Sequence, residues 1–225
     1  MAVRLSRGQW RRYKHLSLLS EKITESASRP LRLLVSVPPR HGKSELVSHW
    51  TPVWFLSNWP GKRIILVSYE ADFAASWGRK ARDTMIANAK ELGVGMREDA
   101  ASTSAWETAE GGGMITAGIG GPITGRGGDC IIVDDPIKNW EEAQSITFRT
   151  GLQDWWASTL RTRLEPGGSI IVVMARWQRE DLIGWLLAEA KEKWEYIALP
   201  AIGDGEVPLW PERYSLGALK DMKQA

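Results

Sequence analysis

Cysteine is almost absent from this sequence, and histidine is scarce. Cys130 is the one cysteine, so the chain cannot form an internal disulfide or a cysteine-rich zinc site. The three histidines, His15, His41 and His49, do not have the spacing of a metal site. No G-x-S-x-G pattern is present, so the usual signature of a nucleophilic serine is missing. The composition fits a reducing compartment and favours neither a disulfide scaffold nor a zinc enzyme.

The sequence also lacks a long apolar run and a strong excess of charge. No stretch of about 20 apolar residues occurs, so we expect neither membrane insertion nor export. The net charge of +2 is too small to indicate a nucleic-acid partner by itself. The 225 residues are 43% hydrophobic and 25% charged, which is typical of one globular domain with a small appendage.

Short apolar runs alternate with amphipathic segments along the chain. We expect buried strands over 31–37, 64–69, 114–119, 130–135, 169–177 and 194–202. Helices are predicted over 71–92, 139–161 and 179–193. Another helix follows Lys43, and Pro52 should kink or shorten it. A basic amphipathic helix is predicted over 4–23. Its basic side either faces solvent or contacts nucleic acid. This alternation predicts an α/β fold of three layers, with a mainly parallel central sheet flanked by helices.

The first strand runs into a loop that ends in Gly-Lys-Ser, within "VSVPPRHGKSELV" (35–47). A helix N-terminus after such a loop offers free N–H groups and a partial positive charge to phosphates. Lys43 is placed to reach the outer phosphates, and the Ser44 hydroxyl can ligate Mg²⁺. A strict phosphate loop has glycine where this chain has Val37. The tripeptide alone is also compatible with an ordinary helix start and a solvated lysine.

A second motif, "CIIVDD" (130–135), ends in two acidic residues and supports the phosphate-loop interpretation. Four apolar residues place Asp134 at the carboxyl end of a buried strand, where ligands bind in parallel sheets. A carboxylate there can hold the Mg²⁺ of a nucleotide, and Asp135 can orient or deprotonate water. The alternative is a strand that runs into an acidic turn.

Three further segments are candidates on chemical grounds. Ala175–Trp177 end a buried strand beside the predicted phosphate site, where a loop can sense hydrolysis or make an ordinary turn. Arg40 in the loop and Arg126 in "TGRGGD" can neutralise charge on a transferred phosphoryl group. Either arginine can also be a plain surface charge.

Five ordered motifs resemble the large terminase subunit of tailed bacteriophages, from about residue 30 to the end. They are "PPRHGKSE", "ILVSYEADFA…GRKARD", "GIGGPITGRGGDCIIVDDPIK", "MARWQREDLIGWL" and "LPAI…LWPERYSL". The resemblance implies a P-loop ATPase of the additional-strand, RecA-like type. It implies a motor that uses ATP to move double-stranded DNA into the procapsid, in a ring of usually five subunits on the portal protein, with the small terminase subunit as a further partner. The host cytoplasm is the expected location.

The same resemblance assigns roles to individual residues. ATP-binding is expected from Pro39, Arg40, His41, Gly42, Lys43, Ser44 and Glu45. Ser44 and Asp134 are expected to hold Mg²⁺, Asp135 to be the catalytic carboxylate, and Arg40 to act in cis. Arg126 is similar to the arginine that acts on the neighbouring subunit's ATP. The coupling motif corresponds to Ala175, Arg176 and Trp177.

Two departures from the family pattern qualify this interpretation. Many relatives have glutamate where this chain has Asp135, and aspartate is shorter by one methylene. The family's nuclease half is also missing. We therefore expect an N-terminal helical segment over 1–28, the ATPase domain over 29–202 and a segment over 203–225 leading toward the absent nuclease. No nuclease activity is expected.

Two other functions remain open at the level of sequence. A helicase or another RecA-like translocase shares the same ATP site, but it usually needs a second RecA-like lobe. The residues after about position 200 are too few to form one. A nucleotide-binding assembly module that does not hydrolyse ATP is also compatible, because Val37 and Asp135 depart from the common patterns.

Overall fold

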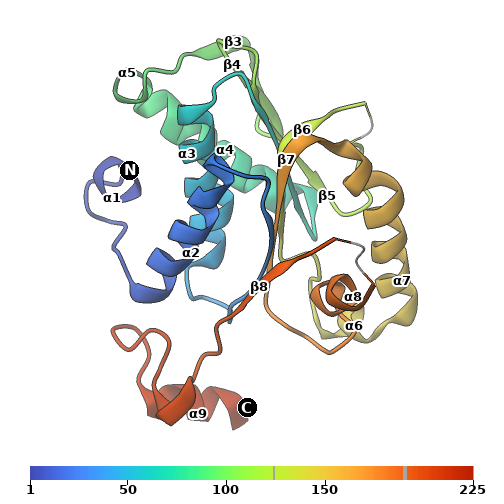
Figure 1. The fold of residues 1–225 in the computed structure, drawn as a ribbon. Helices are drawn as coiled ribbons and strands as arrows, with labels where there is room; N and C mark the ends of the chain where they lie inside the picture. The colour runs from blue at the N-terminus through green and yellow to red at the C-terminus, as the bar shows by residue number, and fades with distance from the viewer. Residues whose placement is uncertain (124, 190–191, 225) are drawn as a thin grey trace.

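One mixed sheet forms the centre of the molecule, and helices flank it (Figure 1). The computed structural model describes residues 1–123, 125–189 and 192–224. The strands are β1 (Arg32–Ser36), β2 (Arg63–Ser68), β3 (Met96–Ala101), β4 (Ala105–Thr108), β5 (Gly113–Gly118), β6 (Gly128–Asp134), β7 (Leu164–Met174) and β8 (Glu195–Ala198). The α-helices are α1 (Ala2–Leu5), α2 (Lys14–Thr24), α3 (Thr51–Asn58), α4 (Ala71–Ala87), α5 (Ala89–Leu92), α6 (Trp140–Gln144), α7 (Ile146–Trp155), α8 (Leu182–Glu189) and α9 (Leu216–Gln224).

The strand order is β3-β4-β5-β2-β6-β7-β1-β8, and every pair from β5 to β8 is parallel. These strands are apolar on both sides because helices cover both faces of the sheet. In β6, for example, Ile131, Ile132 and Val133 are all fully buried. The prediction of a mainly parallel sheet flanked by helices is therefore confirmed.

Two apolar cores lie on the two faces of the sheet (Figure 1). One face carries α2, α3 and α4, and the other carries α6, α7 and α8. Alternate residues of one strand enter different cores, because side chains in a strand alternate between faces. Leu33 and Val35 of β1 belong to the first core, and Leu34 belongs to the second. The N-terminal residues Leu16 and Leu19 of α2 are part of the first core.

The predicted basic helix over 4–23 is wrong as a single element. The structure has the short α1 and then α2, with non-helical residues between them. The break falls at Arg7 (φ 51°) and Gly8 (φ 82°), both in the left-handed region, which ends a helix. A uniform apolar spacing did not reveal this break because Leu5 and Trp10 still pack on the same core.

Two strands were missed and several boundaries differ. β3 and β4 extend the sheet in antiparallel fashion, although only 114–119 was predicted as a strand in this glycine-rich region. β3 reads "MREDAA", which has no apolar alternation, as expected of an edge strand. The predicted helix over 139–161 divides at Ser145, whose side chain accepts from Phe148 N and caps α7. The predicted helix over 179–193 begins only at Leu182, and residues 190–191 lie outside the described residues.

The helix after Lys43 starts with π-helical geometry over Glu45–Trp50 and continues as α3. Pro52 lies at the start of α3, where it needs no intrahelical N–H bond. The hydroxyl of Thr51 donates to Leu46 O at 2.9 Å and so supplies a bond at this junction. Pro52 thus marks a change of helix type. Within the described parts of the chain, no helix is long and apolar enough to cross a membrane.

Candidate functional site

The carboxyl ends of three parallel strands place the predicted motifs at one edge of the sheet. Ser36 of β1 is in register with Met174 of β7, and Asp134 of β6 is in register with Val173. The loops that follow β1, β6 and β7 therefore start side by side. In open α/β sheets this edge is where ligands bind.

The loop after β1 has the backbone of a tight phosphate-type turn. Arg40 has φ 60° and Gly42 has φ 81°, so both lie in the left-handed region. The carbonyl of exposed Pro39 accepts from His41 Nδ1 at 2.8 Å and fixes the turn. A β-carbon on Gly42 would lie 3.1 Å from Leu16 Cδ1, so glycine also suits the close approach of α2. Arg40 itself is exposed at the tip of the loop.

Lys43 is buried at this edge and forms an ion pair with Asp135. Its Nζ lies 2.6 Å from Asp135 Oδ2, and the Lys43 side chain is only 7% exposed. Asp135 has φ 44°, a left-handed backbone that turns its side chain back toward the loop. A buried ammonium needs such a partner, because an unpaired charge is costly away from water. An anionic ligand that takes Lys43 therefore has to compete with Asp135.

Asp134 is fully buried and accepts two hydroxyl hydrogen bonds. Ser44 Oγ donates to Oδ1 at 2.9 Å, and Ser48 Oγ donates to Oδ2 at 2.6 Å. Burial raises the pKa of Asp134 to about 7, and the negative charge of Asp135 adds to this increase. A cation beside Asp134 would favour the ionised form.

The donor atoms of this site fit Mg²⁺. Magnesium prefers oxygen ligands and is usually bound by one or two protein groups plus phosphates and water. Ser44 Oγ and Asp134 Oδ1 are such oxygens and already lie 2.9 Å apart. Among the described residues, no group of three or more His, Cys, Asp or Glu side chains forms a complete metal cage. A metal ion here therefore depends on ligands from a bound phosphate.

The predicted coupling segment contacts the acidic pair directly. Ala175 N donates to Asp135 Oδ1 at 3.0 Å. Arg176 Nε donates to Asp181 Oδ2 at 2.7 Å, and Trp177 N donates to the same oxygen at 3.1 Å. The structure thus brings Ala175 to Asp135, whereas the Arg176 side chain is held by Asp181 of its own loop and by Tyr196 of β8.

Glu45 follows Ser44, but its side chain turns toward His49 of its own helical segment and toward α4. Its carboxylate bonds His49 Nδ1 at 2.8 Å and pairs with Lys80 of α4. Burial raises the pKa of Glu45, but the hydrogen bonds from His49 and Lys80 outweigh this effect, and the net pKa is lowered. Glu45 therefore stays ionised and joins the start of the helix to α4.

Arg126 is the predicted site residue that the structure does not bring to this edge. It is exposed and precedes Gly128, which begins β6, whereas Asp134 ends the same strand. Six residue steps at about 3.3 Å separate the two ends of β6 by about 20 Å. Arg126 also lines a cavity with Arg63 and Gly113, the first residues of β2 and β5. It therefore lies at the edge of the sheet where the parallel strands begin, opposite the loop after β1.

The matched family model is the terminase large subunit, T4likevirus-type, N-terminal, and it covers residues 34–211. This chain belongs to the terminase large subunit family. No curated protein sequence matches it at a significant level. The resemblance drawn from the five sequence motifs is confirmed.

Solved terminase structures have a similar fold. The HK97 bacteriophage large terminase is 14% identical with a TM-score of 0.54, over 80% of this chain and 37% of that protein. A mutant of the Thermus phage P74-26 large terminase ATPase domain is 16% identical with a TM-score of 0.56, over 94% of this chain and 87% of that chain. This terminase chain thus spans little more than a third of the HK97 protein and nearly all of the P74-26 domain.

Several residues at the edge were not predicted. Ser48 lies one helical turn after Ser44, and this spacing signals that both hydroxyls can face one acceptor. The ring of His41 stacks on Tyr214 with centroids 4.9 Å apart, and its carbonyl accepts from His15 Nε2 at 3.0 Å. Tyr214 belongs to the motif "LWPERYSL", which therefore packs against the loop after β1 in this terminase. No sequence spacing indicated that contact.

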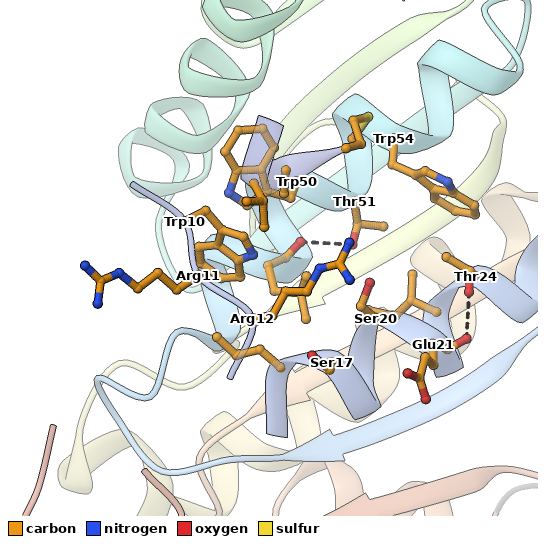
Figure 2. A pocket seen from close by; sticks show the side chains of 16 residues that line it. Trp10, Arg11, Arg12, Ser17, Ser20, Glu21, Thr24, Trp50, Thr51 and Trp54 are labelled. Carbon is orange, nitrogen blue, oxygen red and sulfur yellow. Dashed lines mark hydrogen bonds between the residues drawn. The ribbon is translucent and has the colours of Figure 1, made fainter. Parts of the chain in front are cut away.

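A cavity of about 380 Å³ lies between the N-terminal segment, α2 and the helical segment that runs from Glu45 into α3 (Figure 2). Trp10, Trp50 and Trp54 line it, with Arg12 and Glu21 among its polar residues. In the part of the chain that the structure describes, none of the predicted site residues lines this cavity. It is therefore separate from the edge where the motifs meet.

Proposed function

We propose that this chain is the ATP-hydrolysing motor domain of a phage terminase large subunit, with a RecA-like P-loop fold of the additional-strand type. The observation that carries the proposal is the buried ion pair of Lys43 with Asp135, next to the hydrogen-bonded pair of Ser44 and Asp134. A nucleoside triphosphate with Mg²⁺ requires a lysine and a hydroxyl from a glycine-containing loop and carboxylates at the ends of neighbouring strands. This site has all of these groups.

Each residue has a role in this proposal. The triphosphate is bound by the loop from Pro39 to Glu45, with Lys43 on the outer phosphates and Arg40 acting in cis. Ser44 and Asp134 would hold Mg²⁺, which would neutralise charge on the phosphate oxygens. Asp135 orients and deprotonates the attacking water once Lys43 has turned to the phosphates. The coupling segment, Ala175–Trp177, transmits the state of this carboxylate to the rest of the domain.

The wider assignment rests on family membership. We propose that residues 29–202 form the ATPase domain, with 1–28 as an N-terminal segment and 203–225 leading toward a nuclease domain. The domain works on double-stranded DNA as a homo-oligomeric ring, usually a pentamer, with the portal protein and the small terminase subunit, in the host cytoplasm. The match to 87% of a solved terminase ATPase domain supports the assignment of an ATPase domain.

Phosphate release from ATP is the direct test of this function. The purified chain with ATP and Mg²⁺ should release phosphate, and chelation of the metal should stop release. Adding portal-bearing procapsids and double-stranded DNA should give nuclease-protected DNA when the full motor is assembled. ATP binding without phosphate release, at any protein concentration, would instead support the assembly module. Strand separation on forked DNA would support the helicase.

The position of Arg126 predicts catalysis between subunits. Because Arg126 lies near the first residues of β2 and β5, at the opposite edge of the sheet from its own phosphate loop, Arg126→Ala should lower turnover by at least about 1000-fold, the lower end of the range for other trans-acting arginines. Turnover per subunit of the wild type should rise steeply with protein concentration. Mixing Arg126→Ala with a Lys43→Ala variant should restore activity, since a Lys43→Ala subunit still carries Arg126. Mixtures no more active than either variant alone would contradict the role in trans.

A further inference from the structure

Tyr196 links the base of the phosphate loop to the coupling segment. It lies on β8, which pairs in parallel with β1, with Tyr196 in register with Leu34. Its hydroxyl hydrogen-bonds Ser36 Oγ, at the end of β1, at 2.9 Å. The same hydroxyl accepts from Arg176 Nη1 at 3.2 Å. One phenol oxygen thus connects the strand before the loop with the segment after β7.

The Arg176 guanidinium is held on all its nitrogens by protein acceptors. Nε donates to Asp181 Oδ2 at 2.7 Å, and Nη2 donates to the carbonyls of Gln178 (3.0 Å) and Arg179 (3.3 Å). Nη1 is the nitrogen that reaches Tyr196. A planar guanidinium fixed in this way is held in one orientation. Arg176 therefore transmits the position of Tyr196 to its own loop.

Asp181 makes the loop after β7 a single rigid unit. It is fully buried and accepts from Arg176, from Trp177 N and, at 3.0 Å, from Gly184 N in the first turn of α8. A buried carboxylate with three donors is well satisfied and caps the helix. A shift of Arg176 therefore moves this loop as a whole.

The rigid loop ends at the carboxylate that the proposed reaction needs. Ala175 N donates to Asp135 Oδ1, and Lys43 holds the other oxygen in the absence of nucleotide. When Lys43 moves to bound phosphates, the Ala175 N–H remains as a fixed donor to Asp135. The position of Asp135 then depends on Ala175, and through the neighbouring Arg176 on Tyr196. Tyr196 in turn bonds Ser36, at the start of the phosphate loop.

We propose that Tyr196 is a positioning residue for ATP hydrolysis, because its hydroxyl keeps the coupling segment and the phosphate loop in fixed relation. This inference rests on the proposed function and adds a residue that lies outside all the sequence motifs. Tyr196 does not touch the reacting atoms. It acts through Arg176 on the carboxylate of Asp135.

Tyr196→Phe tests the proposal because it removes one oxygen and keeps the ring. We expect kcat to fall about tenfold, the effect of losing a hydrogen bond to a charged group, while KM for ATP stays within about twofold. Tyr13→Phe is the matched control, since Tyr13 packs by its ring on Trp210, with centroids 4.5 Å apart. The control should keep wild-type kcat. In a Ser36→Ala background, Tyr196→Phe should cost less than it does alone.

A second readout does not depend on hydrolysis. Hydrogen exchange at the Ala175 amide, which bonds Asp135, should be about tenfold faster in Tyr196→Phe, with little change in the core strand β6. Unchanged kcat together with unchanged exchange would overturn the positioning role. If the wild type releases no phosphate, the proposed function fails, and the exchange experiment still decides whether Tyr196 holds the loop.

Discussion

Replacing Lys43 with alanine is expected to reduce ATP turnover by at least about 100-fold, or about 2.7 kcal/mol of transition-state stabilisation. Lys43 is the buried cation at the carboxyl edge, and its Nζ already lies 2.6 Å from Asp135. A bound triphosphate would bring several negative charges to this edge, and the charge of Lys43 would neutralise part of them. Phosphate release by the purified variant, measured against wild type with saturating ATP and Mg²⁺, checks this expectation.

A matched control separates the loss of this charge from a general loss of stability. Lys62 is about half exposed, at 47%, and pairs with Asp129 at 3.5 Å near the start of β2, away from the site. Lys62→Ala should therefore keep normal turnover. Both variants should be compared by thermal unfolding. Turnover close to wild type in Lys43→Ala would remove the basis for the proposed ATPase function.

The sequence was sufficient to predict the edge where the motifs meet. Buried apolar runs over 31–37, 130–135 and 169–177 predicted parallel strands, and parallel strands bring their carboxyl ends together. This geometry alone places Lys43 near the acidic pair. The contact between Ser44 and Asp134 agrees with the same reasoning, because Asp134 ends β6 and Ser44 belongs to the loop that follows β1.

The rest of the site depends on contacts between distant residues that carry no local pattern. Tyr196 reaches Arg176 and Ser36 only because β8 pairs with β1, a register that single-sequence periodicity does not determine. The packing of Tyr214 on His41 likewise joins segments more than 170 residues apart. Edge strand β3 escaped prediction because charged residues protect exposed sheet edges and hide the apolar alternation.

The aspartate at position 135, where many family members have glutamate, has a physical reason in this structure. Its φ of 44° lies in the left-handed region, which aspartate and asparagine adopt more readily than longer side chains. From this backbone the short carboxylate already reaches both Lys43 Nζ and Ala175 N. The shorter side chain therefore does not imply an inactive site.

Asp135→Asn is accordingly the second change with a large expected effect. Asparagine keeps the size and can still accept from Ala175 N, but it cannot take a proton from water, so turnover should fall by at least about 100-fold. ATP binding should be as tight as in wild type or tighter, because Lys43 no longer has an ion-pair partner to leave. Asp135→Glu should retain more turnover than asparagine, at some cost in stability from the left-handed backbone. Turnover and nucleotide affinity measured on all three proteins test this ordering, and an asparagine variant within about threefold of wild type would exclude Asp135 as the base.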